Sequence, residues 1–418
     1  MKGLPLLVTT AIAYTLRPTQ LSTQGHRRHR PATAPSSKAD DADDASDDPS
    51  AALGDWRAFR AQLMETGVVT TEDAAPEAET KEARKPTAGP SARNSALVEA
   101  QSAKLFRELK IGSWAHDVAN PEVGGLLLRM PLEMQLVSTP KSYWGSRLRR
   151  FAESDGAAPD DGSVLSEMLL YRVAQRFLKQ QLQKVAEKAK PDANGQLTVD
   201  ARLLTEQERE LVEMHQRAVA AWQEVVLVLE HSPERSTSVV INRPVAQRAE
   251  RELSTALVSA LEVDTAAKLT ADQFSLAFAP KFAAYAGTSP KRGISVKDVA
   301  IIHGVEGLDG ATEIAPGIGI YRGGGAHAAR NVISEANDSL EFRFFIGRQE
   351  WAAGDLDRAV AAGEYRPAAC ARALALKQCL GLPKPLWHEI MEMLGGVSLE
   401  VSRLELLKRE DLDDAKAP

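Results

Sequence analysis

Two titratable side chains stand together at the end of an apolar run in the middle of the chain. Glu230 and His231 close the run that begins at Val225. Successive side chains of a strand point to opposite faces, so this pair would present two proton-transfer groups at one strand end. A Glu–His pair can act as general acid and base. The alternative is structural, because both side chains can also hydrogen-bond the turn that follows.

An arginine and two glycines follow other apolar runs and could bind an anion. Asn242 and Arg243 end a second run, and a guanidinium holds carboxylate or phosphate through two parallel hydrogen bonds. The alternative for Arg243 is a pair with a nearby carboxylate. Gly323 and Gly324 lie between a third run and a predicted helix, where backbone N–H groups can face a phosphate. A tight turn is the alternative for these glycines.

His303 stands at a further strand end, and we include it with the residues above in a candidate ligand or partner surface. The full set is Glu230, His231, Asn242, Arg243, His303, Gly323 and Gly324. The sequence contains no P-loop, no G-x-S-x-G nucleophile motif and no H-E-x-x-H motif. Within the body, no two histidines have metal-ligand spacing. We therefore expect no catalytic residue, no metal site and no cofactor.

The cysteine content excludes two further classes of site. Cys370 and Cys379 are the only two cysteines, too few for a disulfide scaffold or a four-cysteine zinc site. Both stand in a segment with a helical pattern, where we expect them to be buried small apolar side chains.

Short strands and amphipathic helices would position these residues. Apolar runs predict strands over 124–130, 224–230, 238–242, 298–303, 318–321 and 341–346, with a seven-residue turn at 231–237. Periodicity predicts helices over 164–190, 205–218, 326–336, 355–362 and 385–395. The apolar face expected for the first helix consists of Leu165, Leu169, Val173, Phe177 and Val185. Strands mixed with helices predict an α/β (α+β) layer fold.

The N-terminal region differs from the rest of the chain. Residues 1–100 contain 3 of the 22 aromatic side chains, so the folded body is expected to begin near 95–120. A basic residue and a ten-residue apolar run open the segment 1–37, and the remainder of it is basic and lacks acids. This order is typical of a signal peptide joined to a transit peptide, which predicts import into a plastid (chloroplast). Secretion and a disordered basic tail are the alternatives.

Charge is distributed unevenly along the chain. The acidic run after residue 37 predicts a disordered acidic linker with short helices over 38–119. The basic and acidic stretches cancel, so the net charge of −6 belongs to residues 51–418. A mildly acidic body argues against nucleic-acid binding through bulk charge. No apolar run is long enough to be a transmembrane segment.

Taken in order, seven motifs resemble one family. They are Leu-Leu-Arg-Met-Pro (127–131), Val-Val-Leu-Val-Leu-Glu-His (225–231), Val-Ile-Asn-Arg-Pro (240–244), Ile-His-Gly (302–304), Pro-Gly with Gly-Gly (316–324), Phe-Phe-Ile-Gly with Trp and Gly-Asp-Leu (344–356), and Leu-Trp-His-Glu-Ile to Leu-Gly-Gly (386–396). This order resembles the AlgH-like proteins, also called YqgE or UPF0301 (DUF179), in their plant and algal branch. The resemblance implies a compact α/β domain with a strongly bent, partly barrel-like mixed sheet flanked by helices.

The resemblance also defines an insertion and a tail. It covers 120–144 and 223–408, so residues 145–222 would be a helical hairpin inserted into a domain spanning 120–408, and 409–418 would be a disordered tail. The chain departs from the family pattern at Arg235 and Ser238, where glycines are usual, and at Gly325, where many members have aspartate. The Gly-Gly-Pro of the family is replaced by the residues at 285–288. A site that depends on those residues would be altered here.

The resemblance implies little about chemistry, so we expect a non-enzymatic binding or regulatory module with an unknown protein partner, contacted through the insert 145–222. One alternative is a small hydrolase or transferase acting on a phosphorylated metabolite, with His231 as base. It requires His231, Arg243 and Gly323–Gly325 to converge in one pocket. The other alternative is a transcriptional regulator, as bacterial members are labelled, which requires a basic stripe on the body.

Overall fold

The computed structural model describes residues 13–15, 101–156, 162–191, 197–245, 254–255, 257–258, 269–278, 284–287, 299–379 and 384–407. The predicted presequence, apart from strand β1 (Ala13–Thr15), the predicted linker up to residue 100, and the tail 409–418 lie outside the described residues. The linker was predicted to extend to residue 119, and this is wrong for residues 101–119. They contain a helix (Ala103–Ile111) with a buried Leu105 and a strand (Ala115–Asp117) that pairs with residues 368–370. Strand β1 pairs antiparallel with β5 (Leu197–Asp200), which also pairs with β4 (Lys190–Pro191).

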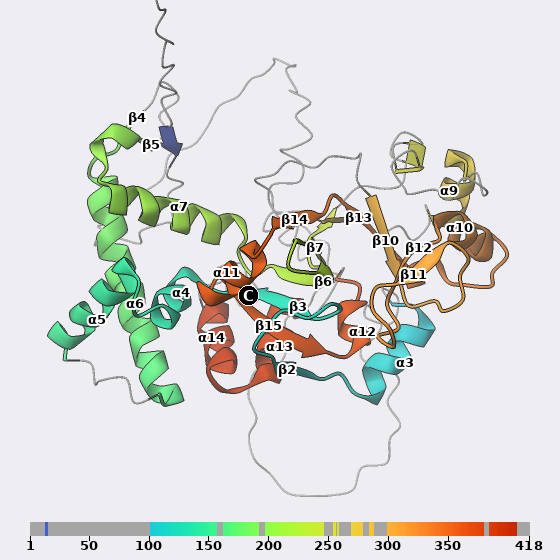
Figure 1. Cartoon of the computed structure of the whole chain (residues 1–418), viewed down its shortest axis with the longest axis horizontal. Helices are drawn as coiled ribbons and strands as arrows, with labels where there is room; N and C mark the ends of the chain where they lie inside the picture. Colours follow the sequence, from blue (N-terminus) through green and yellow to red (C-terminus); the bar gives the residue numbers. More distant parts are fainter. Residues whose placement is uncertain are drawn as a thin grey trace, which may run out of the picture.

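The remaining described strands form two six-stranded sheets (Figure 1). The first sheet is antiparallel and has the order β14-β7-β6-β3-β15-β2. Its strands are β14 (Gln349–Ala352), β7 (Arg235–Val240), β6 (Val225–His231), β3 (Leu126–Arg129), β15 (Tyr365–Cys370) and β2 (Ala115–Asp117).

The second sheet has the order β11-β12-β10-β13-β9-β8, with β13 and β9 parallel. Its strands are β11 (Ala311–Glu313), β12 (Tyr321–Gly323), β10 (Val299–His303), β13 (Phe342–Ile346), β9 (Ala284–Ala286) and β8 (Pro244–Val245). The expected α+β class is confirmed. Neither six-stranded sheet closes into a barrel, so the described strands form two open sheets where the resemblance implied one strongly bent, partly barrel-like sheet.

The alternation of side chains along β6 explains why its sequence is apolar without interruption. Val225, Leu227 and Leu229 face a central core that also contains Ile302 and Phe345 of the second sheet. The intervening valines face a smaller core on the other side, beneath helix α11 (Asp355–Ala361). A strand buried on both faces needs apolar residues at every position.

Short helices complete the two cores. The central core includes α12 (Arg372–Ala375), α13 (Leu386–Leu394) and α14 (Gly396–Leu407). The far face of the second sheet packs against α9 (Ala271–Phe278) and α10 (Gly325–Ile333). Helix α3 (Ala103–Ile111) and the 3₁₀ turns η1 (Ala201–Leu203) and η4 (Ser339–Glu341) are further helical elements.

A helical layer occupies the chain between β3 and β6, which are neighbours in the first sheet. It consists of α4 (Leu132–Ser138), α5 (Tyr143–Ser154), α6 (Val164–Ala186) and α7 (Glu206–Ala220). Figure 1 shows this layer to one side of the sheets, drawn in green and teal. Helix α6 packs on α4 and α5 around Trp144 and Phe177. The layer is therefore larger than the predicted hairpin, and we use this name for α4–α7 below.

The buried face of α6 differs from the prediction. Val173, Phe177 and Val185 are buried as expected, but Leu165 is 71% exposed and Leu169 is 41% exposed. A spacing of four residues advances about 40° beyond a full helical turn. Over three such steps, Leu165 lies roughly 120° around the helix from Phe177, so the two side chains cannot share one face.

Three boundaries in the sheets also differ from the prediction. The turn between β6 and β7 is shorter than seven residues, because β7 already begins at Arg235. The strand expected over 318–321 is β12, which begins only at Tyr321. Cys370 ends strand β15 and does not lie in a helix. None of the described helices is long and apolar enough to cross a membrane.

Candidate functional site

The carboxylate of Glu230 lies between two guanidinium groups at the junction of the sheets. Its Oε1 is 3.0 Å from Nη1 of Arg322 on β12. Its Oε2 is 3.4 Å from Nη2 of Arg235, at the start of β7. Glu230 therefore joins the first sheet to the second. Arg235 contributes to this contact from the edge of the hairpin.

His231 bridges the two strands of the β6–β7 hairpin. Its Nδ1 lies 2.8 Å from Oγ of Ser236, the residue directly opposite on β7. Its Nε2 lies 3.6 Å from Oδ1 of Asp357 on α11. Ser236 is buried, so its hydroxyl is shielded from a substrate. This geometry matches the structural alternative, in which the histidine holds the hairpin.

Asn242 closes the other end of the same hairpin. Its Oδ1 accepts a hydrogen bond from the backbone N–H of Val225 at 2.9 Å. Its Nδ2 donates to the carbonyl oxygen of Gln223 at 2.8 Å. Both polar groups of the amide are thus used within the fold, and they fix the start of β6.

Arg243 has the carboxylate partner that was the alternative to anion binding. Its Nη2 lies 3.3 Å from Oε1 of Glu224, which is fully buried, and donates to the carbonyl oxygen of Ala220 at 3.1 Å. These contacts place Arg243 beside the start of β6. His231 ends the same strand, six residues beyond Val225. At about 3.3 Å per residue the two sites are roughly 20 Å apart, so they do not converge.

The prediction that His303 belongs to the candidate ligand or partner surface is wrong, because its side chain is fully buried. Its Nδ1 accepts a hydrogen bond from the N–H of Val305 at 3.2 Å, so Nε2 carries the proton toward the carbonyl oxygen of Gly323 at 3.3 Å. Burial lowers the pKa of His303 to about 4. The ring is neutral at pH 7 and holds β10 to the neighbouring strand β12, whose Tyr321 stacks on it.

Gly323 and Gly324 form the tight turn that was the alternative to phosphate binding. Their φ angles are 97° and 69°, in the region that favours glycine. A Cβ on Gly323 would lie 2.7 Å from the carbonyl oxygen of Gly310, and one on Gly324 would lie 3.1 Å from that of Asp309. The close approach of this neighbouring segment requires glycine at both positions.

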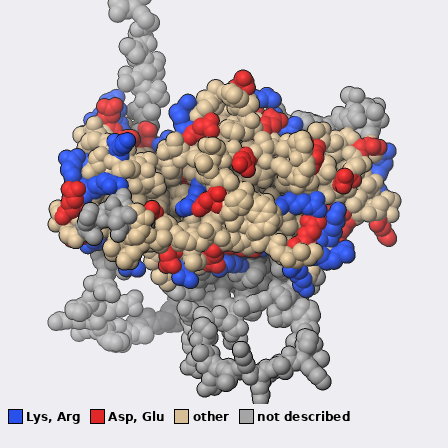
Figure 2. Space-filling view, turned by 60° about the horizontal axis from the view of Figure 1, so that its bottom comes forward, with Lys and Arg blue, Asp and Glu red and all other residues tan. Residues whose placement is uncertain are grey.

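The described residues contain no group of three or more His, Cys, Asp and Glu side chains arranged to hold a metal ion. On the face shown in Figure 2, Lys and Arg are interspersed with Asp and Glu. A continuous basic stripe, which nucleic-acid binding through the phosphate backbone would favour, is not seen on that face.

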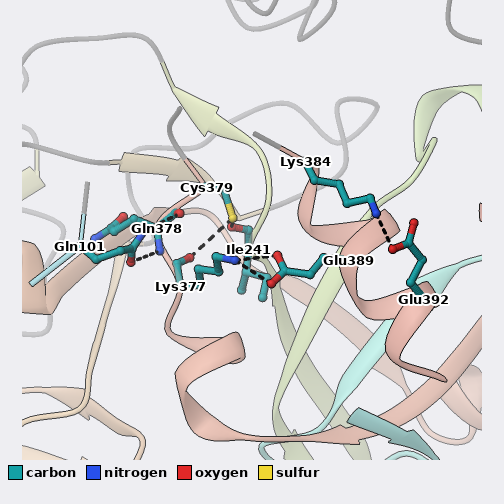
Figure 3. A network of polar contacts seen from close by, with 8 residues as sticks. All are labelled: Gln101, Ile241, Lys377, Gln378, Cys379, Lys384, Glu389 and Glu392. Atoms are coloured by element: carbon teal, nitrogen blue, oxygen red, sulfur yellow. Dashed lines mark hydrogen bonds and ion pairs between the residues drawn. The ribbon is translucent and has the colours of Figure 1, made fainter. Parts of the chain in front are cut away.

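A buried polar network joins distant segments that the motif search did not connect (Figure 3). The side-chain amide of Gln101 makes two hydrogen bonds of 2.9 Å with the backbone of Gln378: its Nε2 donates to the carbonyl oxygen, and its Oε1 accepts from the N–H. The hydroxyl of Tyr285 donates to Oε1 of Gln378 and accepts from the N–H of Cys379. This network uses Tyr285 of β9. No pattern in the sequence links residue 101 to residue 378.

Cys379 belongs to this network, whereas Cys370 lies at the end of β15. The Sγ of Cys379 lies 3.4 Å from the carbonyl oxygen of Ile241. Burial raises the pKa of the Cys379 thiol to about 12, and burial does the same for Cys370. A thiol that stays protonated at neutral pH is a poor nucleophile and a poor metal ligand. Both cysteines are half-buried, not fully buried as expected.

A second residue that the motif search missed is Arg343. It stands within the apolar strand β13 and is almost completely buried. A single charged residue inside a continuous apolar run is the signal that would have drawn attention to it.

A family model and two solved structures are similar to parts of this chain. Residues 213–398 match the model of the AlgH-like family, DUF179. A crystal structure of a protein from Corynebacterium diphtheriae is 17% identical, with a TM-score of 0.30, and the match covers 43% of this chain and 82% of that chain. The solution structure of the AlgH protein from Pseudomonas aeruginosa, UPF0301, is 14% identical, with a TM-score of 0.28 and coverages of 47% and 85%. No curated protein matches.

The family match begins within α7 and ends within α14, and so contains β6 to β15. Strand β3 precedes the matched residues, yet it lies between β6 and β15 in the first sheet. The motifs at 225–231, 240–244 and 344–356 all lie in the match. Residues 213–398 of this chain are therefore similar to the AlgH-like (DUF179) family.

Proposed function

We propose that this chain is a non-enzymatic binding or regulatory module of the plastid, and that its helical layer binds an acidic segment of a protein partner. The observation that carries the proposal is an exposed stripe on α6 that begins with leucines and continues with arginines. Plastid location rests on the order of charges and apolar residues in the N-terminal segment 1–37.

The stripe consists of Leu165, Leu169, Arg172 and Arg176. Their spacing of four, three and four residues places them along one face of the helix. All four side chains are exposed, whereas the opposite face of α6 is buried against α4 and α5. Two adjacent exposed leucines expose apolar surface to water, and covering that surface with a partner is favourable.

The charge of α5 and α6 indicates which partner fits the stripe. These two helices contain seven basic residues and two acidic ones, whereas α4 and α7 together contain two basic residues and five acidic ones. The basic residues are Arg147, Arg149, Arg150, Arg172, Arg176, Lys179 and Lys184. Complementary charge speeds association and favours acidic partners. Leucines gain nothing from a phosphate backbone, so the stripe fits an acidic segment with apolar side chains better than a nucleic acid.

Affinity purification of the mature protein from isolated plastids tests the proposal when matched variants are compared. We expect a captured protein to be lost with the double variant Leu165→Ser/Leu169→Ser. It should be retained with Ile333→Ser, which changes a side chain 41% exposed on α10, outside the layer. Equal capture by wild type and both variants would show that the stripe is not the binding surface.

Two other outcomes would contradict separate parts of the proposal. Recovery of the protein outside plastids, in the medium of intact cells, would reject plastid location and support secretion. A captured component that is released by nuclease, and depends on Arg172 and Arg176 but not on the leucines, would support the regulator alternative.

A further inference from the structure

A small pocket lies between α3, α12 and the start of β13. Its enclosed volume is about 20 Å³, and about 290 Å³ when the open space at its mouth is included. Lys104, Arg343 and Arg372 line it together with the carboxylates Glu108 and Glu341. The enclosed part is too small for a nucleotide, since drug-sized ligands occupy clefts of roughly 300–1,000 Å³.

Arg343 is the unusual member of this lining. Its side chain is 2% exposed. Its Nη1 donates to the carbonyl oxygen of Ala375 at 3.1 Å, while its Nε is buried and has no hydrogen-bond partner among the described residues. The described ionisable groups that act on it are Tyr285 and Cys379, which are both neutral at pH 7 because burial raises the pKa of each.

The guanidinium is nevertheless charged. Burial lowers the pKa of Arg343 to about 10, which still leaves it protonated at neutral pH. A buried charge is costly unless it is paired with an opposite charge or fully hydrogen-bonded. The described structure gives Arg343 one carbonyl contact, and a guanidinium has five N–H donors.

The other charges of the pocket do not compensate for Arg343. Arg372 pairs with Glu108 through two contacts, Nε to Oε2 at 3.0 Å and Nη2 to Oε1. Glu341 accepts a hydrogen bond from Nδ2 of Asn337 at 2.7 Å. Lys104 adds a further positive charge in the first turn of α3, where the helix dipole is also positive. The pocket therefore has more positive than negative charge.

We propose that this pocket binds a small oxyanion, with Arg343 as its buried ligand and Lys104 at its mouth. Phosphate, sulfate and a short carboxylate share the required chemistry, because a guanidinium can donate two parallel hydrogen bonds to each of them. This assignment is independent of the helical layer and of any protein partner. The competing explanation is that Arg343 only caps the carboxyl end of α12 through Ala375.

Titration of the full chain with inorganic phosphate, sulfate or acetate, at constant ionic strength, tests the proposal by calorimetry. We expect saturable binding of at least one of them, and the anion that binds identifies the class. Lys104→Gln should raise the dissociation constant about threefold, as expected for the loss of one exposed charge. The matched control is Lys110→Gln, which removes a charge from the last turn of the same helix and should leave affinity unchanged.

Arg343→Met should abolish binding while the near-ultraviolet circular dichroism remains that of the wild type. Saturable binding by a folded Arg343→Met protein would overturn the proposal. An equal loss of affinity in Lys104→Gln and Lys110→Gln would also overturn it, because it would indicate attraction by overall charge. The absence of saturable binding at anion concentrations below about 10 mM would do the same. If Arg343→Met does not fold, the two lysine variants decide between the outcomes.

Discussion

The hydroxyl of Tyr171 donates a hydrogen bond to the carboxylate of Glu405, and both side chains are buried. Tyr171 lies on α6 of the helical layer, and Glu405 lies on α14 near the end of the described chain. Burial, followed by the negative charge of Glu405, raises the pKa of Tyr171 above its ordinary value. The helical layer is therefore attached to α14 through a buried polar contact as well as through apolar packing.

Tyr171→Phe should destabilise the protein by about 2 to 3 kcal/mol, because it removes a donor from a buried carboxylate. Equilibrium unfolding in urea measures the change. The double variant Tyr171→Phe/Glu405→Gln is the control, and it should recover part of the loss by removing the buried charge. A single variant as stable as the wild type would contradict the role we assign to this contact.

The α6 helix allows a direct comparison between its exposed and buried faces. Phe177→Ala should cost about 3 to 5 kcal/mol of unfolding free energy, the usual range for a buried aromatic side chain. Leu169→Ala should cost less than about 1 kcal/mol, because the side chain is 41% exposed. Thermal unfolding of both variants measures the difference. Equal losses would mean that the leucine face is buried.

Acid should weaken the fold through His303. Its pKa is about 4 in the folded protein and about 6.5 when unfolded. The unfolded chain therefore binds more protons between these values, and stability falls as the pH is lowered through this window. Between pH 7 and pH 4.5 the loss from this group is about 2 kcal/mol. Urea unfolding at the two pH values should show a smaller loss for His303→Gln than for the wild type.

An equal loss of stability between pH 7 and pH 4.5 in the wild type and in His303→Gln would assign the acid sensitivity to other groups. Absolute stability at pH 7 is a separate quantity. It should be lower in His303→Gln because that variant cannot reproduce both hydrogen bonds of the neutral ring.

The two thiols should resist modification in the native protein. Burial raises the pKa of Cys370 and Cys379 to about 12, so little thiolate exists at pH 8. Reaction with a chromogenic disulfide reagent should be slow in buffer and rapid in concentrated urea. A rapid reaction of either thiol in buffer would show that it is accessible and would contradict its structural role.

How much of the fold the sequence predicts depends on the environment of each element. Strands such as β6 and β13 are predictable because both faces are buried, and an uninterrupted apolar run results. The face of α6 is less predictable, since a fourfold spacing drifts around the helix and brings Leu165 to the surface. Strand β15 was missed because Arg366 and Pro367 interrupt its pattern, although it lies between two other strands.

The candidate site illustrates a different limit. A strand end was expected to expose His303, but β12 pairs beside it and buries it. Contacts of this kind depend on how two sheets meet, and local sequence does not determine that. The structural alternatives for Arg243 and for the glycine turn could be stated in advance, because the fold must satisfy buried charges and close backbone contacts.

A photo-crosslinking residue placed on the helical layer tests the central proposal most directly. A protein with a benzophenone side chain at position 169, compared with one modified at position 333, would be irradiated in plastid extract. We predict a crosslink to one acidic protein from position 169 only, and its loss at high salt as charge attraction is screened. Identical crosslinks from both positions, or no protein crosslink from position 169, would contradict the proposal.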